Sequence, residues 1–244
     1  MKTRFIYRNL KARFRDQRQE ITALLHTARP GETVVDVGAN KGGYLYWMSR
    51  AVGHGHVVAF EPQPNLARYL RKVVAACDLR NVTVEEKAAS ERSGTMILHM
   101  PGGCDSPEAS LEDAVRSRTA CGQIEVETVR LDDYFRSCPR RISVIKVDVE
   151  GHEFSVFRGA EGILLEHSPL LIFEAENRHL SRGTVFDVLN YLRDLRYDGF
   201  FVRRNSLVPI DGFVPEIHQR QVGQRFWDEP SYCNNFIMKR ANAQ

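Results

Sequence analysis

The chain has 244 residues, of which 43% are hydrophobic and 27% are charged, and these fractions exclude a disordered or fibrous protein. Its net charge of +3 is too small to indicate a nucleic-acid-binding protein, and its five widely spaced cysteines predict neither a disulfide framework nor a zinc site. No apolar run is long enough for a transmembrane helix and no secretory signal is evident, so we expect a cytoplasmic protein.

The N-terminal residues 1–30 form the most basic part of the chain. They hold eight Lys and Arg residues against Asp16 and Glu20, which gives +6, so residues 31–244 together carry −3. Apolar residues recur at helical spacing between the cations and predict an amphipathic helix over residues 4–28. The cations are either simply solvated, or they form a lid or docking arm for an anionic substrate or partner. We expect residues 1–30 to be a helical segment that precedes a single domain over residues 31–244.

Residues 31–90 alternate between short β-branched runs and amphipathic segments. This pattern predicts strands over residues 33–37, 56–60 and 82–84, with helices over residues 44–52 and 66–77 between them. Strands and helices that alternate at this spacing indicate an α/β fold with a mostly parallel sheet, of the Rossmann-like, doubly wound kind.

The alternation is interrupted between residues 94 and 131. Two candidate strands, over residues 95–100 and 124–131, have no long helix between them and predict an antiparallel β excursion from the parallel sheet. We expect a mobile loop over residues 101–121, with a short helix after Ser110. The later elements that the pattern predicts are a strand over 142–149, a helix over 153–165, a strand over 170–174, a helix over 184–195, a hairpin of 199–203 with 207–210, and a last antiparallel strand over 235–238.

A loop of mostly small residues follows the first predicted strand. Its residues are Gly38, Ala39, Asn40, Lys41 and Gly42. Small residues before a helix N-terminus let a ligand approach the backbone, but this loop matches neither the GxGxxG fingerprint nor a Walker loop. About 20 residues later Glu61 ends the second strand, where a carboxylate can accept hydrogen bonds from both hydroxyls of a ribose. Together they favour a nucleoside-bearing cofactor without phosphates, and S-adenosylmethionine is such a cofactor.

Charged residues mark the fourth predicted parallel strand. Lys146, Asp148 and Glu150 alternate along it and so share a face, although a buried strand is expected to be apolar on both faces. They lie towards the carboxyl end, where α/β folds bind ligands, and Glu174 ends the next strand. Either Lys146 forms a structural ion pair with Asp148 or Glu174, or the carboxylates belong to a functional site. His152, one position from the start of the following helix, is either a cap or surface residue or part of the functional site, and we favour the former.

Three motifs in this order resemble those of the FkbM-type methyltransferases. They are Thr33–Gly42 (TVVDVGANKG), Phe60–Pro62 (FEP) and Ile145–Glu153 (IKVDVEGHE), and the likeness continues through Gly159-Ala160 to Glu174. The resemblance covers about residues 31–175. It implies a class I methyltransferase fold and S-adenosylmethionine-dependent O-methyl transfer to a hydroxyl of a sugar or secondary metabolite.

The resemblance also assigns roles to residues. The loop from Gly38 to Gly42 would pass the methionine end of the cofactor, Glu61 would hold the ribose, and Lys87 and Ala88 would border the adenine. The complete set of cofactor-binding residues that we predict is Asp36, Gly38, Ala39, Asn40, Gly42, Glu61, Pro62, Lys87, Ala88 and Asp148.

Methyl transfer to an alcohol needs a base or a metal at the oxygen, because the hydroxyl pKa lies far above 7. The predicted catalytic residues are Asp148, Glu150 and Glu174, with Glu150 as the base. A purely electrostatic role towards the cationic sulfonium is the alternative. The same carboxylates could hold a divalent cation, but no further ligand set is evident and we assign no metal.

We expect a small-molecule hydroxyl acceptor, free or linked to a carrier or lipid, and no nucleic-acid partner. The alternative function is a non-catalytic, Rossmann-like nucleoside-binding module whose basic N-terminus contacts a nucleic acid or a protein.

Overall fold

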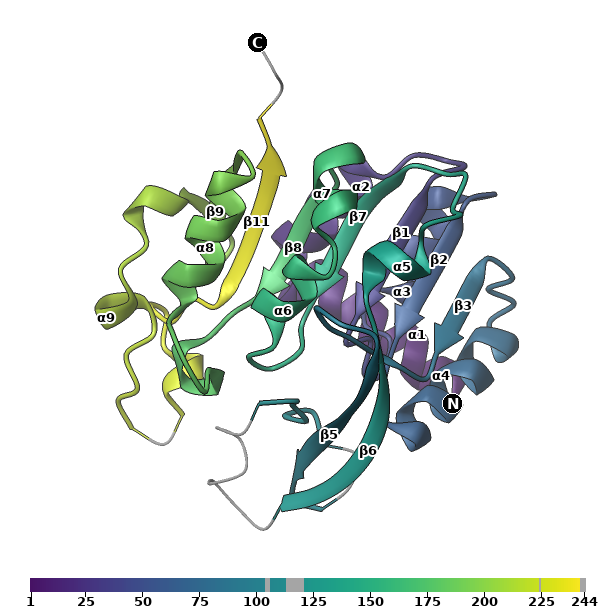
Figure 1. Cartoon of the computed structure of the whole chain (residues 1–244), viewed down its shortest axis with the longest axis horizontal. Helices are drawn as coiled ribbons and strands as arrows, with labels where there is room; N and C mark the ends of the chain where they lie inside the picture. Colours follow the sequence, from purple (N-terminus) through teal and green to yellow (C-terminus); the bar gives the residue numbers. More distant parts are fainter. Residues whose placement is uncertain (104–105, 113–120, 224, 242–244) are drawn as a thin grey trace.

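The computed structural model describes residues 1–103, 106–112, 121–223 and 225–241. Its main element is an eight-stranded sheet in the order β10-β9-β11-β8-β7-β1-β2-β3 (Figure 1). Neighbouring strands are parallel from β8 to β3. These five strands are β1 (Thr33–Val37), β2 (His56–Phe60), β3 (Val82–Glu85), β7 (Ile142–Val147) and β8 (Leu170–Glu174). The predicted α/β fold with a mostly parallel sheet is therefore confirmed.

The C-terminal part completes the sheet with antiparallel pairs. The last strand β11 (Asn235–Arg240) lies between β8 and β9 (Tyr197–Arg203) and is antiparallel to both. A hairpin joins β9 to the edge strand β10 (Ser206–Pro209). The predicted hairpin and final strand are thus confirmed.

Helices cover both faces of the sheet because its central strands are apolar on both sides. Alternate residues of β1 point to opposite layers, with Val34 in one core cluster and Val35 and Val37 in the other. One layer holds α1 (Lys2–Lys11), α2 (Arg18–Thr27), α3 (Leu45–Val52) and α4 (Pro64–Ala76). The other holds α5 (Leu131–Tyr134), α6 (Glu153–Arg158), α7 (Glu161–Glu166) and α8 (Val185–Asp194), as Figure 1 shows. A short helix α9 (Pro215–His218) follows the β9–β10 hairpin.

The helix predicted over residues 4–28 is interrupted. A π-helical turn, Ala12–Asp16, and a non-helical Gln17 separate α1 from α2. Phe5 and Ile21 are fully buried, so both helices pack on the sheet through one continuous core cluster. The buried Asn9 anchors the segment further, because its side-chain amide donates to the carbonyl of Gly42 at 2.9 Å.

The helix predicted over residues 153–165 is divided into α6 and α7. The division falls at Gly159, where a Cβ atom would lie 2.1 Å from the carbonyl oxygen of Ser90. The preceding strand β7 is also shorter than predicted, because it ends at Val147 instead of Val149. Glu150 then has a φ of 55°, so strand alternation does not extend to it.

The β excursion is confirmed as a separate three-stranded sheet. Strand β5 (Gly94–Pro101) pairs antiparallel with β6 (Cys121–Val129), and β4 (Ala88–Ala89) pairs parallel with β6. Strand β6 ends two residues before the predicted end because α5 begins at Leu131. The short helix predicted after Ser110 and part of the loop predicted over 101–121 lie outside the described residues.

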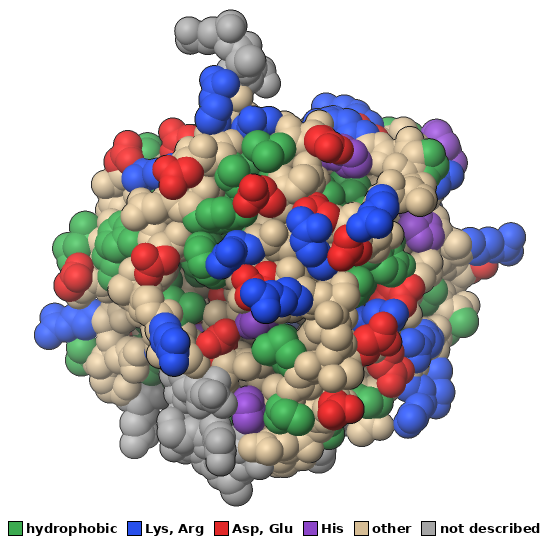
Figure 2. Space-filling view, viewed as in Figure 1, with side chains coloured by type: hydrophobic (Ala, Val, Ile, Leu, Met, Phe, Trp, Pro, Cys, Tyr) green, Lys and Arg blue, Asp and Glu red, His purple; other side chains and the backbone are tan. Residues whose placement is uncertain are grey.

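Two surface properties accompany this fold. On the face seen in Figure 2, acidic and basic side chains are interspersed, as the small net charge leads one to expect. Within the described residues, none of the helices combines the length and apolar character that crossing a lipid bilayer requires.

Gly38 has a backbone that no other residue can adopt easily at this position. Its φ is +75°, and a Cβ atom would lie 1.8 Å from the carbonyl oxygen of Asp148. We expect Gly38→Ala to lower the free energy of unfolding by at least about 2 kcal/mol, because strain and a backbone clash add. Chemical denaturation measures this change. Gly43→Ala is the matched control, since the nearest atom would be 3.9 Å away, and equal losses for both variants would contradict the prediction.

Candidate active site

A cavity of about 240 Å³ opens at the carboxyl ends of β1, β2 and β7. This edge of a parallel α/β sheet is where such folds bind ligands. Nine of the predicted site residues line it: Gly38, Asn40, Glu61, Pro62, Lys87, Ala88, Asp148, Glu150 and Glu174. The structure thus brings together most of a set that is scattered over 137 positions, from 38 to 174, in the sequence.

The other three predicted residues lie elsewhere. Asp36 and Ala39 line a second cavity of about 320 Å³, which shares Gly38, Asn40 and Asp148 with the first. Gly42 lines neither cavity. A Cβ atom there would approach Phe5 to 3.1 Å, so this glycine allows α1 to pack against the loop.

Glu61 is a buried carboxylate at the rim of the first cavity. Its two oxygens accept the backbone N–H groups of Asn40 at 2.7 Å and of Gln63 at 3.0 Å. A carboxylate has about four acceptor positions, so these bonds fix the group and leave positions for further donors. The side chain is 2% exposed, and burial raises its pKa to about 7. Beside it, the buried Oε1 of Gln63 has no partner among the described residues.

Lys146, on β7, links this strand to β1 and to the glycine loop, residues 38–42. Its Nζ lies 3.3 Å from both Asp36 Oδ1 and Asp148 Oδ2, and it donates to the carbonyl of Gly38 at 2.9 Å. Asp36 and Lys146 are directly paired in the β1–β7 register. Burial acts against the charge of Lys146, but Asp148 and Asp36 nevertheless raise its pKa. The predicted ion pair with Asp148 is confirmed, and its second partner is Asp36, not Glu174.

The three predicted catalytic carboxylates form one cluster. Asp148, Glu150 and Glu174 each place an oxygen within 4.8 Å of the others, which is close enough to hold a cation between them. Burial and then the neighbouring charges of Asp148, Glu150 and Glu176 raise the pKa of Glu174 well above its usual value. Burial also raises the pKa of Glu150. His179, whose Nδ1 lies 2.6 Å from Glu150 Oε2, acts in the opposite direction and lowers this pKa.

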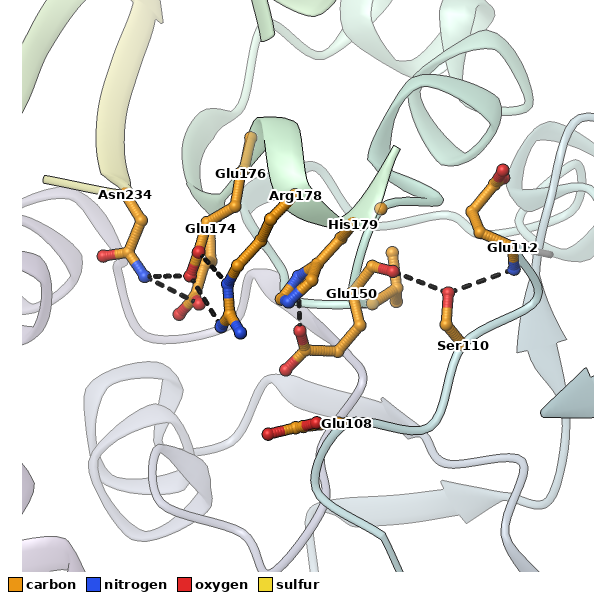
Figure 3. Close-up of polar contacts among 12 residues, drawn as sticks. Glu108, Ser110, Glu112, Glu150, Glu174, Glu176, Arg178, His179 and Asn234 are labelled. Carbon is orange, nitrogen blue, oxygen red and sulfur yellow. Dashed lines mark hydrogen bonds and ion pairs between the residues drawn. The ribbon is translucent and has the colours of Figure 1, made fainter. Parts of the chain in front are cut away.

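A second ring of polar residues holds this cluster in place (Figure 3). The amide of Asn234 bridges Glu174 and Glu176 at 2.8 and 2.7 Å. Burial opposes the charge of Glu176, but Arg178 and Tyr232 bind its carboxylate and lower its pKa to about 2. Sequence reasoning missed these residues, although the acidic and basic run directly after β8 was a signal that could have found Glu176, Arg178 and His179.

Residues 106–112 cover the cavity from the side of the β excursion. Ser110 Oγ donates to the carbonyl of Glu150 at 2.6 Å, and the side chain of Gln63 donates to the carbonyl of Ser106. His152 contacts Glu112 through Nδ1 and Ser90 through Nε2, each at 2.9 Å. His152 occupies the N-cap position of α6, although its side chain makes no capping bond, and at 5% exposure it is not a surface residue. It lines the cavity and fixes the covering segment.

Comparison with known proteins identifies the family. Residues 36–198 match the methyltransferase FkbM domain, which is more than half of the chain, so the chain belongs to this family. It is 31% identical over 155 residues to Methyltransferase sdnD of Sordaria araneosa, covering 52% of this chain and 60% of that protein. It is 24% identical over 144 residues to Methyltransferase 1 of Beauveria bassiana, covering 52% of this chain and 58% of that protein. The chain thus spans about three fifths of the length of these relatives.

Solved structures share the fold. Methyltransferase FkbM from Methylobacillus flagellatus superposes with a TM-score of 0.54 at 18% identity, covering 90% of this chain and 50% of that one. A structure from Streptococcus mutans in complex with SAH gives a TM-score of 0.53 at 10% identity, with 92% and 97% covered. The fold is that of the class I methyltransferases, and S-adenosyl-L-methionine is the cofactor that this family implies.

The residues at the cavity suit that cofactor. Gly38 carries no Cβ, which would overlap the carbonyl of Asp148, so the loop passes close to Asp148 while Gly38 lines both cavities. Glu61 has acceptor positions for ribose hydroxyls, and the unpartnered Oε1 of Gln63 can accept a further hydrogen bond.

Cofactor affinity should depend on pH through Glu61. Its pKa of about 7 means that roughly one tenth of the side chain is ionised at pH 6 and nine tenths at pH 8. An ionised carboxylate accepts the ribose hydroxyls better, so we expect affinity for S-adenosylhomocysteine to rise about tenfold over this range. Calorimetry at both pH values measures it. Glu61→Gln serves as the control, because it should bind more weakly and lose most of the pH dependence.

The free protein should respond to pH in the opposite direction. Because folding raises the pKa of Glu61 from 4.5 to about 7, its stabilising contribution is complete below pH 4.5 and is lost as the pH rises to about 7. Thermal unfolding without ligand should therefore show Glu61→Gln gaining stability relative to the parent as the pH rises. A parallel pH dependence in the two proteins would contradict the assignment.

Proposed function

We propose that this chain is an S-adenosylmethionine-dependent O-methyltransferase whose acceptor is a hydroxyl of a sugar or secondary metabolite, free or linked to a carrier or lipid. The observation that carries the proposal is the carboxylate cluster of Asp148, Glu150 and Glu174, which lines the same cavity as Glu61. A cofactor held at Glu61 and an acceptor at the cluster would then lie in one cavity, at the short distance that in-line transfer requires.

The cavity lining supports a proposed cofactor site. Glu61 would hold the ribose hydroxyls, the backbone from Gly38 to Asn40 would border the methionine end, and Pro62, Lys87 and Ala88 would enclose the adenine. S-adenosylmethionine supplies an electrophilic methyl group on a sulfonium. Asp148 would contribute negative charge near that sulfonium, although Lys146 at 3.3 Å compensates part of it.

Glu150 is the best candidate for the base among the three carboxylates. Asp148 is already paired with Lys146. Burial raises the pKa of both Glu150 and Glu174, but that of Glu174 lies well above its usual value, which favours its protonated form. Glu150 instead has His179 at 2.6 Å, whose imidazole can orient the carboxylate and stabilise its charge. In the proposed step Glu150 takes the hydroxyl proton while the acceptor oxygen bonds to the methyl carbon and the sulfur–methyl bond breaks. A neutral thioether and a methyl ether remain.

The acceptor can be found by transfer of a labelled methyl group. Incubation of the chain and labelled cofactor with a panel of glycosides and metabolite extracts should give a labelled product in which one hydroxyl has become a methyl ether. The non-catalytic alternative makes a different forecast, since binding to a nucleic acid or protein would then survive the loss of both Glu61 and Asp148.

Substitutions in the cluster separate the roles of its members. We expect Glu150→Gln to lower turnover by about 10²–10⁴, the usual cost of a lost base, and to change cofactor affinity less than about threefold. Asp148→Asn should weaken cofactor binding and turnover together, because it removes the negative charge proposed to lie near the sulfonium and one of the two ion pairs of Lys146. Single-turnover rates and calorimetry provide the two measurements.

One control variant and two possible outcomes test the assignment. His99→Asn, which changes a buried residue outside the cavity lining, reports how far general disturbance of the β excursion lowers turnover. Full activity of Glu150→Gln together with an inactive Glu174→Gln would show that the base is Glu174, on β8. Loss of all activity on chelation would instead mean that the cluster holds a divalent cation, and the base assignment would be wrong.

A further inference from the structure

The N-terminal helical segment carries an apolar surface that the protein core does not use. Tyr7, Leu10 and Phe14 recur at spacings of three and four residues, and their exposed fractions are 66%, 41% and 67%. The opposite side of the same segment buries Phe5 and Asn9. We call the exposed set of Tyr7, Leu10 and Phe14 the apolar stripe. Three large apolar side chains in one row are more than the isolated exposed residues that a protein surface ordinarily shows.

Cations flank this stripe. Lys2, Arg4, Arg15 and Arg18 are exposed, while Arg8 and Lys11 are half-buried on the side that lines the second cavity. Of the two carboxylates in the segment, Asp16 is paired with Lys11 and Arg15, and Glu20 is buried. The exposed side of residues 2–18 is therefore strongly positive, in contrast to the rest of the chain, which carries −3.

The stripe is also held in position. The ring of Phe14 meets Trp47 edge to face at 6.3 Å between centroids, and the guanidinium of Arg13 lies over Phe14. Asn9 fixes α1 to α3 and to the glycine loop, because it accepts from the backbone N–H of Tyr46 and donates to Gly42. A partner would thus meet an ordered surface and would not have to order this segment on binding.

We infer that the exposed side of residues 2–18 docks on an anionic lipid surface. A helix with apolar residues between cations lies in the interface of a charged bilayer, where the apolar side chains enter the headgroup region and the cations meet lipid phosphates. A second copy of the chain is disfavoured, because two surfaces of this positive charge repel each other. A nucleic acid would meet the cations but would not bury Leu10 and Phe14.

This surface adjoins the candidate active site. Arg8 and Lys11 line the second cavity, which shares Gly38, Asn40 and Asp148 with the first. Docking would consequently bring a lipid-linked acceptor close to the cofactor loop. That consequence rests on the proposed function, whereas the docking itself does not, so the two can fail separately.

Vesicle sedimentation of the full chain without cofactor tests the inference. We expect binding to vesicles of phosphatidylcholine with 30% phosphatidylglycerol, on the order of fivefold weaker for each exposed cation replaced, and loss of most binding at 0.5 M salt. Vesicles of phosphatidylcholine alone should bind little. Replacing the stripe by Tyr7→Ser, Leu10→Ser and Phe14→Ser should reduce binding at least tenfold.

A matched variant controls for lost apolar surface. Ile97→Ser, Leu165→Ser and Ile217→Ser remove side chains of 44%, 41% and 56% exposure on β5, α7 and α9, and this variant should bind as the parent does. Equal binding by the stripe variant, or no binding to anionic vesicles, would overturn the inference. So would concentration-dependent dimerisation, or binding to a short duplex, that disappears with the stripe.

Discussion

The buried ion cluster around Lys146 is the interaction on which the rest of the site depends. Lys146 joins Asp36 on β1 to Asp148 after β7 and holds the carbonyl of Gly38. Removing Lys146 would leave the buried Asp36 as an uncompensated charge, at a cost of roughly 3–5 kcal/mol. The ends of two central strands and the loop that begins at Gly38 are thus positioned by one ammonium group, beside residues that line both cavities.

Negative charge then increases outwards from Lys146. Asp148 is compensated, but Glu150 and Glu174 share a small space with it, and their raised pKa values express the cost of ionising all three. A cationic cofactor would relieve this repulsion, which gives a physical reason why a sulfonium suits the cavity. On the side of the carboxylate cluster farther from Lys146, the positive charge of Arg178 compensates the carboxylate of Glu176. In the proposed function the carboxylates would therefore act through their negative charge towards the cofactor as well as through a base.

Local patterns allowed most of the fold to be predicted. The apolar run of β1, the small-residue loop and Glu61 follow one another within 29 residues, from 33 to 61, so their relation is visible in the sequence. Contacts between distant segments were not visible. Asn9 binds Gly42 and Asn234 binds Glu174, and nothing local marks either residue. The positive φ of Glu150 also has no sequence signature, so strand alternation was extended two residues too far.

The N-terminal helices illustrate the same limit. Their charge and amphipathic pattern were evident, but only the structure shows which apolar side chains are buried and which remain exposed. The account depends most on the cofactor lying in the first cavity, and a crystal structure of the chain with S-adenosylhomocysteine tests this directly. We predict that the ribose hydroxyls contact Glu61 and that the sulfur faces Asp148 and Glu150. A ribose bound elsewhere, or a sulfur directed away from the carboxylate cluster, would contradict the account.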